Sequence, residues 1–201
     1  MQLKAQNISF RYEKERWLFK NANFTLNSGE IVGLVGPSGY GKTTFCRILA
    51  GYEKPSQGTI TLDELPVRKK GYNPVQLVFQ HPEKAINPRW KMNKILSEGW
   101  QPTGEILELL GIEQEWLTRW PNELSGGELQ RFCVARALGP ETRFLIADEM
   151  TTMLDAITQA QIWKAIMDIA KKREMGIIVV SHEARLIKRL CHRVIEFNQF
   201  I

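Results

Sequence analysis

Three short segments of this sequence carry the residue types that phosphate chemistry needs, and they occur in a fixed order. The middle segment, Leu124-Ser125-Gly126-Gly127-Glu128, is followed directly by Leu129-Gln130-Arg131. A glycine-rich loop with a lysine precedes it, and an apolar run that ends in two carboxylates follows it. The order is more informative than any single segment, and it indicates a nucleotide site assembled from separate parts of the chain.

The first segment is a phosphate-binding loop. The pattern G-x-x-x-x-G-K-[ST] is satisfied by residues 36–44, after the apolar run 31–35, which predicts a strand that enters the loop. The glycines let backbone N–H groups point at phosphate oxygens. We expect Lys42 to reach the β- and γ-phosphates and the Thr43 hydroxyl to bind Mg²⁺. The expected nucleotide contacts in this loop are Gly36, Ser38, Gly39, Gly41, Lys42, Thr43 and Thr44.

The third segment is an apolar strand that ends in acids, Phe144-Leu145-Ile146-Ala147-Asp148-Glu149. Such a strand would bring Asp148 to the metal side of the phosphate loop, with Glu149 on the other face of the pleat. We therefore expect Asp148 to bind Mg²⁺, through water, and Glu149 to polarise the attacking water. Strands ending in acids are common, so the prediction depends on the position of this strand after the middle segment.

Together these motifs resemble the ATP-binding subunit of an ABC transporter, over nearly the whole chain from Gln2 onward. The resemblance implies an α/β P-loop NTPase fold, with a mostly parallel core sheet, an N-terminal antiparallel β subdomain and an inserted α-helical subdomain. We expect one domain, residues 1–201, with the helical subdomain at approximately residues 91–138. Strands near Leu145 and Ile178 alternate with a helical pattern over residues 156–173, as in parallel α/β proteins.

The resemblance also assigns roles to residues outside the phosphate loop. Tyr12 would stack on adenine, Gln80 would contact Mg²⁺ and the attacking water, and His182 would contact the γ-phosphate. Each of these has an ordinary alternative: an edge-strand aromatic, a solvated loop residue and a structural histidine. The expected catalytic residues are Glu149, His182, Lys42 and Gln80. The expected metal ligands are Thr43, Gln80 and Asp148.

In the resembled family the middle segment binds ATP held by another subunit. Ser125, Gly126 and Gly127 would cap a helix whose N-terminus faces the γ-phosphate across a dimer interface, and Asp155 would lie in a loop that crosses it. The resemblance therefore implies ATP and Mg²⁺, a second ATPase subunit of the same or a different chain, and transmembrane permease subunits. A solute-binding protein outside the membrane would be an indirect partner.

Composition agrees with a globular ATPase and adds limits. Of the 201 residues, 43% are apolar and 24% are charged, and the formal net charge is +5. The cations are scattered, so we expect mostly solvated surface rather than a nucleic-acid site. No apolar run reaches the about 20 residues that span a bilayer, and no secretory signal is recognised, so we expect a peripheral protein on the cytoplasmic face of the membrane. The three cysteines are widely spaced, which favours neither a zinc site nor disulfides.

The loop after Gln80 allows a narrower resemblance. Asn87-Pro88-Arg89 is similar to a loop in the dipeptide, oligopeptide and nickel importer group, and the regions 124–138 and 185–194 resemble the second ATPase of nickel and metallophore importers. Peptide, nickel and metal chelate all remain open as solutes. We expect Arg89 to contact a membrane subunit, although a proline turn with a solvated cation would have the same sequence.

Three departures from the family pattern affect details. Tyr40 is bulky where a small residue is usual, Met150 replaces a proline that often follows the catalytic acid, and the sequence ends at Ile201, so we expect no C-terminal extension of the kind some relatives carry. A soluble ABC-type ATPase not coupled to transport and a regulatory, non-hydrolysing cassette remain alternatives. A DNA-acting ATPase would need a long coiled-coil insertion, and a P-loop kinase or GTPase would leave the segment 124–128 unexplained.

Overall fold

Two β-sheets form the framework of the molecule. The structure is a computed structural model, and it describes residues 1–13, 16–67 and 71–200; Ile201 lies outside this range. The first sheet is antiparallel, in the order β2-β1-β4-β5, and the second is parallel, in the order β6-β7-β8-β3-β9. The strands are β1 (Gln2–Phe10), β2 (Phe19–Asn27), β3 (Ile31–Val35), β4 (Gln57–Leu62), β5 (Leu65–Pro66), β6 (Val75–Val78), β7 (Phe144–Asp148), β8 (Gly176–Val180) and β9 (Arg193–Glu196).

The parallel sheet is the core of the nucleotide-binding half. Every residue of β7 and β8 is buried, as expected for strands covered on both faces. β7 pairs with β6 and β8, and β3 pairs with β8 and β9, so β3 and β7 flank β8 with their carboxyl ends at one edge. Ligands of open α/β sheets bind at that edge, and the sequence places the phosphate loop and Asp148 there.

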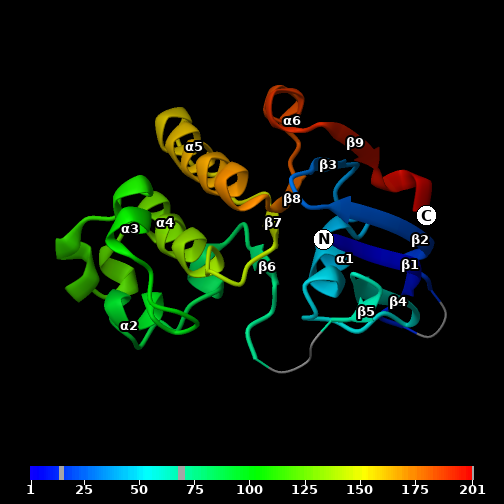
Figure 1. The fold of residues 1–201 in the computed structure, drawn as a ribbon, viewed down its shortest axis with the longest axis horizontal. Helices are drawn as coiled ribbons and strands as arrows, with labels where there is room; N and C mark the ends of the chain where they lie inside the picture. The colour runs from blue at the N-terminus through cyan, green and yellow to red at the C-terminus, as the bar shows by residue number, and fades with distance from the viewer. Residues whose placement is uncertain (14–15, 68–70, 201) are drawn as a thin grey trace.

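Helices cover the sheet and build the second lobe. They are α1 (Lys42–Leu49), η1 (Pro82–Lys84), α2 (Met92–Leu96), α3 (Gly104–Leu109), η2 (Gln114–Thr118), η3 (Pro121–Glu123), α4 (Gly126–Ala137), α5 (Ala156–Arg173), α6 (Ala184–Leu190) and η4 (Phe197–Phe200). Figure 1 shows α2, α3 and α4 grouped at one end of the molecule and the antiparallel sheet at the other, with the parallel strands between them. The predicted α/β fold with an antiparallel subdomain and an inserted helical part is confirmed.

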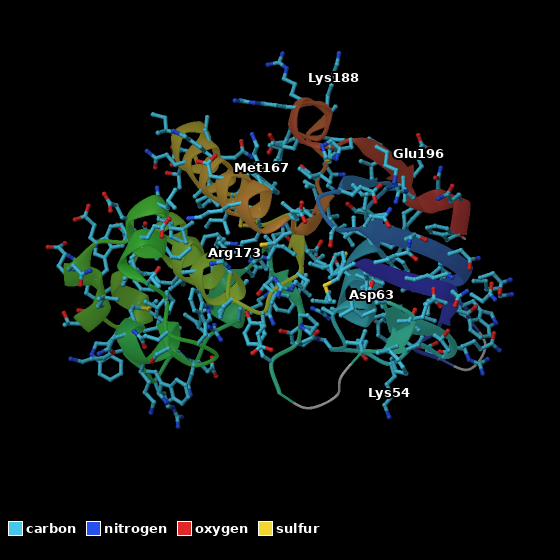
Figure 2. All side chains as sticks on the ribbon, viewed as in Figure 1. Lys54, Asp63, Met167, Arg173, Lys188 and Glu196 are labelled. Carbon is cyan, nitrogen blue, oxygen red and sulfur yellow. The ribbon has the colours of Figure 1, made fainter. Side chains whose placement is uncertain are left out.

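Charged side chains cover the outer faces of both lobes. Lys54 and Lys188 extend away from opposite edges of the molecule in Figure 2. No helix in the described part of the chain is both long enough and apolar enough to cross a bilayer.

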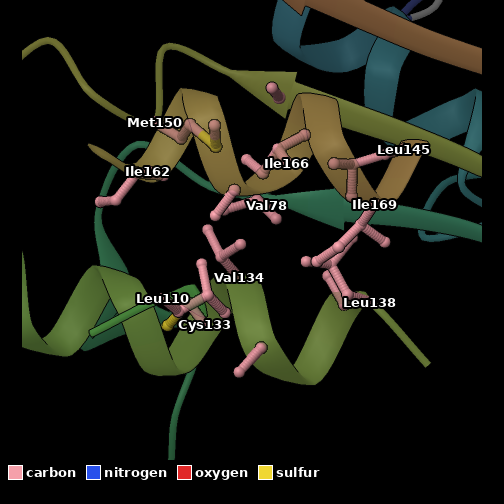
Figure 3. Close-up of a cluster of buried hydrophobic side chains, with 14 of the residues drawn as sticks. Val78, Leu110, Cys133, Val134, Leu138, Leu145, Met150, Ile162, Ile166 and Ile169 are labelled. Carbon is pink, nitrogen blue, oxygen red and sulfur yellow. The ribbon is translucent and has the colours of Figure 1, made fainter. Parts of the chain in front are cut away.

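The helical lobe and the parallel sheet share one apolar cluster. Val134 of α4, Val78 of β6, Leu145 of β7 and Ile166 of α5 belong to it, and all four are fully buried or nearly so. Figure 3 shows side chains of α4 and α5 converging on Val78 and Leu145 in this cluster. Since α4 begins at the segment 124–128, this packing fixes the direction in which that segment faces.

Candidate functional site

The phosphate loop connects β3 to α1 and is shaped by its glycines. Gly36, Gly39 and Gly41 have φ angles of 148°, 82° and 100°, which L side chains rarely adopt. A Cβ on Gly41 would also lie 2.9 Å from Leu18 Cγ, so the loop has no room for a side chain there. The spacing of the glycines in the sequence therefore corresponds to a real backbone requirement.

Lys42 lies over this loop. It is 5% exposed, and its Nζ donates hydrogen bonds to the carbonyl oxygens of Gly36 at 2.7 Å and Pro37 at 2.9 Å. A buried ammonium held by neutral carbonyls leaves positive charge inside the loop. Together with the N-terminus of α1, it makes the loop suitable for an anion.

Asp148 ends β7 next to the start of α1. Asp148 Oδ1 is buried and has no hydrogen-bond partner among residues 1–13, 16–67 and 71–200. Burial raises the pKa of Asp148, and the Glu149 carboxylate adds to the rise, whereas Thr43 and the positive charge of Arg47 oppose it.

An unpaired buried carboxylate oxygen beside a hydroxyl fits a hard divalent cation. The described residues contain no group of three or more His, Cys, Asp or Glu side chains that could hold a metal by themselves. Mg²⁺ commonly binds to one or two protein oxygens and takes its other ligands from phosphates and water. Thr43 and Asp148 therefore fit Mg²⁺ that arrives with a nucleotide.

Glu149 does not continue the pleat of β7, contrary to our expectation. The strand ends at Asp148, and Glu149 has a φ of 51°, in the left-handed region. Its N–H still donates to the carbonyl of Val180 at 3.0 Å, which holds the strained residue against β8. The turn redirects the carboxylate toward the loops beyond the strands.

That carboxylate lies between Gln80, which is expected to contact Mg²⁺ and the attacking water, and His182, which is expected to contact the γ-phosphate. Gln80 Nε2 donates to Glu149 Oε2 at 3.2 Å, and His182 Nε2 lies 3.0 Å from Glu149 Oε1. His182 Nε2 also lies 3.5 Å from Ser38 Oγ in the phosphate loop. Residues from four separate loops are thus brought to one place.

Tyr12 lies beside the phosphate loop and is 65% exposed. Its hydroxyl is 2.9 Å from Thr44 Oγ1, and its ring packs edge-on against Phe10 at 4.8 Å between centroids. A ring fixed at its hydroxyl end, with an exposed face, can stack on a planar base. The structure also places Tyr40, which is 40% exposed, along the cavity that Tyr12 lines.

Ser125 lies at the N-terminus of α4 and faces solvent. Its backbone N–H donates to Glu128 Oε2 at 2.8 Å, and the N–H of Glu128 donates back to Ser125 Oγ at 3.3 Å. A Cβ on Gly126 would contact nothing within 4 Å, so this helix end is open. The cavity in front of it, about 490 Å³, is lined by Ser125, Gly126, Gly127 and Gln80, but by no described residue of the phosphate loop.

Comparison with known proteins agrees with this arrangement. The family model described as ABC transporter matches residues 19–152, which is more than half of the chain. This chain belongs to the ABC transporter family.

Two proteins similar to this ABC cassette are ATP-binding proteins of nickel import. The nickel import ATP-binding protein NikE of Rhodospirillum rubrum is 34% identical over 201 residues, covering 90% of this chain and 73% of its own length. NikE of Escherichia coli K12 is 35% identical over 196 residues, covering 88% of this chain and 73% of its own.

Solved structures share the fold of the cassette. The dimeric bacterial ABC transporter cassette MJ0796 superimposes with a TM-score of 0.82 at 24% identity, over 97% of this chain and 94% of that one. A dimeric, post-hydrolysis form of MJ0796 bound to ADP and Pi gives 0.81 at 25% identity, over 96% and 93%.

The geometry gives a part in the ABC site to two residues of the middle region to which the sequence analysis assigned no role. Gln130 of α4 is 1% exposed, and its Nε2 donates to the carbonyl of Phe79 at 3.1 Å, which joins the start of α4 to the loop of Gln80. Glu128 closes the capping box, and its position three residues after Ser125 could have revealed it. Gln130 gave no comparable sequence signal, because its partner is a distant backbone carbonyl.

Proposed function

We propose that this chain is the ATP-binding and ATP-hydrolysing subunit of an ABC importer. The observation that carries the proposal is the placement of the Glu149 carboxylate, 3.2 Å from Gln80 Nε2 and 3.0 Å from His182 Nε2, beside the phosphate loop. A carboxylate in this position can take a proton from a water molecule that attacks the γ-phosphate in line.

Each catalytic residue then has one task. Lys42 and His182 stabilise the negative charge that develops on the γ-phosphate, and Glu149 orients and deprotonates the water. Thr43, Asp148 and Gln80 would hold Mg²⁺, which neutralises phosphate charge when bound. Tyr12 would support the adenine ring.

The open helix end at Ser125 supports a site shared between two cassettes. Ser125, Gly126 and Gly127 would meet the γ-phosphate held by the phosphate loop of the second chain, where free N–H groups and the helix dipole favour an anion. The chain carries both half-sites, so a second copy suffices to complete two sites. A different ATPase with the same motifs could take the place of the copy.

Coupling to transport would pass through the loop that follows Gln80. This loop lies beside a groove of about 430 Å³ whose lining includes Tyr52, Tyr72, Phe79 and Arg136. A groove at this position suits a short helix of a permease subunit. The chain would therefore be peripheral, on the cytoplasmic face of the membrane, and a solute-binding protein would act through the permease.

The solute is proposed by class. The names of the relatives favour nickel, and the segment Asn87-Pro88-Arg89 keeps peptides and metal chelates open. The test is uptake of labelled nickel, a dipeptide and a nickel chelate by source cells whose own copy carries Glu149→Gln. The compound whose uptake is lost is the solute. Cells that carry Lys188→Gln, a substitution of an exposed lysine, are the control and should take up all three compounds normally. Normal uptake of all three, with ATP hydrolysis lost, would favour a soluble ATPase.

Arg89 is our candidate for the permease contact. It is exposed, and its N–H donates to Asn87 Oδ1 at 3.0 Å, which holds the turn and directs the loop. We predict that Arg89→Glu lowers co-purification with the permease while ATP hydrolysis by the isolated chain is retained. Complex assembly equal to that of the unchanged protein would contradict the assignment.

A further inference from the structure

The surface around α2 combines tryptophans with cations. We define the lysine–tryptophan surface as Trp90, Lys91, Lys94 and Trp120. Both lysines are exposed, and Trp120 is 43% exposed, whereas Trp90 is half-buried and packs against the apolar cluster of the helical lobe. The surface therefore has a packed, half-buried base and an exposed, charged rim.

Cation–π contacts organise these side chains. Lys94 Nζ lies 4.1 Å from the centroid of the Trp90 ring, and Lys91 Nζ lies 5.9 Å from that of Trp120. The two tryptophans come from separate segments, which are joined where the N–H of Met92 donates to the carbonyl of Arg119 at 3.0 Å. A hollow beside them is lined by Pro88, Arg89, Trp120, Asn122 and Glu123.

Neither Lys91 nor Lys94 forms an ion pair with a carboxylate in the part of the chain that the structure describes. Two acids of the helical lobe are already engaged: Glu123 accepts a hydrogen bond from the N–H of Trp120 at 2.6 Å, and Glu98 pairs with Arg136. The lysine charges are thus available to an anionic partner.

We propose that the lysine–tryptophan surface binds the headgroup layer of anionic phospholipids. Lysine ammonium groups attract phosphate-bearing headgroups, and exposed tryptophan rings favour the polar–apolar boundary of a bilayer. Lysines next to exposed tryptophan rings suit the boundary between lipid headgroups and acyl chains, whereas a surface that only contacts water needs no exposed tryptophan. The contact would orient the helical lobe against the membrane independently of any permease subunit.

The experiment measures partitioning of the purified full chain onto vesicles by sedimentation. Mixed phosphatidylglycerol–phosphatidylcholine vesicles are compared with pure phosphatidylcholine vesicles. The test variant is Lys91→Gln/Lys94→Gln. The matched control is Lys188→Gln/Arg189→Gln, which removes the same charge from α6, at the opposite edge of the molecule from α2 in Figure 1.

Each cation near an anionic surface contributes about 1 kcal/mol, or about fivefold in partitioning. We expect the unchanged chain to bind only the anionic vesicles, the test variant to bind them about 25-fold less well, and the control to lose much less. Trp120→Ala should also weaken binding while the melting temperature stays the same. Binding to no vesicle, or equal losses in test and control variants, would overturn the proposal. Loss of permease co-purification without loss of vesicle binding would assign the surface to a protein instead.

Discussion

The two phosphate-binding parts of this chain differ in how completely the fold encloses them. The phosphate loop is enclosed: Lys42 is buried, Gly41 has no room for a side chain, and Asp148 lies behind it. The helix end at Ser125 is exposed, and a Cβ on Gly126 would meet nothing within 4 Å. The first part can bind a nucleotide by itself, whereas the second offers only one wall of a site.

The difference teaches where the chain needs a partner. Ser125 and Glu128 satisfy each other's backbone groups, so α4 is stable without any ligand. A helix end that is capped, rigid and open is prepared for an anion presented from outside. In our account that anion is the γ-phosphate of ATP bound to another cassette.

The largest expected effect is at the enclosed part. We predict that Lys42→Ala lowers ATP hydrolysis by about 10³-fold or more, because it removes the buried positive charge that meets the phosphates. Steady-state ATPase assays and nucleotide titrations measure it. Lys188→Ala, an exposed lysine on α6, is the control. Wild-type turnover in Lys42→Ala would show that the loop does not hold ATP.

Glu149→Gln separates chemistry from binding. We predict that hydrolysis falls by about 10²-fold or more while MgATP binding is retained, since the amide keeps the shape and loses the base. Single-turnover assays and equilibrium binding measure the two effects. Full turnover in this variant would contradict the general-base role of Glu149.

A pair of glycine variants compares the two parts directly. Gly41→Ala should lower the free energy of unfolding by about 1–3 kcal/mol, because φ is 100° and the Cβ would clash with Leu18. Gly126→Ala should leave stability unchanged or raise it by up to about 1 kcal/mol, since alanine favours a helix. Both substitutions should reduce ATP hydrolysis. Denaturant unfolding measures the change in stability, and ATPase assays measure the change in hydrolysis. A Gly126→Ala protein that is destabilised but hydrolyses ATP normally would contradict the prediction that this helix end is open and binds phosphate.

The smallest expected change in stability is at Ser125, where a pair of variants distinguishes helix capping from phosphate binding. Ser125→Ala should lower the free energy of unfolding by about 1 kcal/mol, and Ser125→Asp, which keeps a capping oxygen, should not. Both should lose hydrolysis, the second because its charge repels the γ-phosphate. Normal hydrolysis by a stable Ser125→Asp protein would limit Ser125 to a structural role.

Much of the fold could be predicted from local sequence. The helix expected over residues 156–173 corresponds to α5, because Asp155 caps it through the N–H groups of Ile157 and Thr158. The strands expected at 31–35 and 144–149 were readable as apolar runs beside functional residues, although the second ends one residue earlier, at Asp148. The helix that Ser125, Gly126 and Gly127 were expected to cap corresponds to α4, which begins at Gly126 with a capping box.

The remaining features depend on tertiary contacts that no local pattern encodes. The left-handed backbone of Glu149 depends on a hydrogen bond to Val180 of a neighbouring strand. The Tyr12–Thr44 contact and the Gln130–Phe79 contact join residues 32 and 51 positions apart. For the site, sequence motifs identified the expected residues, while only the structure shows how Gln80 and His182 flank Glu149.

The central claim is that the exposed helix end of one copy closes the enclosed phosphate loop of another. Its most direct test is the molar mass of the Glu149→Gln protein, measured by light scattering with and without MgATP. The double variant Glu149→Gln/Ser125→Asp is measured in the same way. We predict that MgATP doubles the mass of the first protein and leaves the second monomeric. A Glu149→Gln protein that binds MgATP tightly and remains a monomer would contradict the claim.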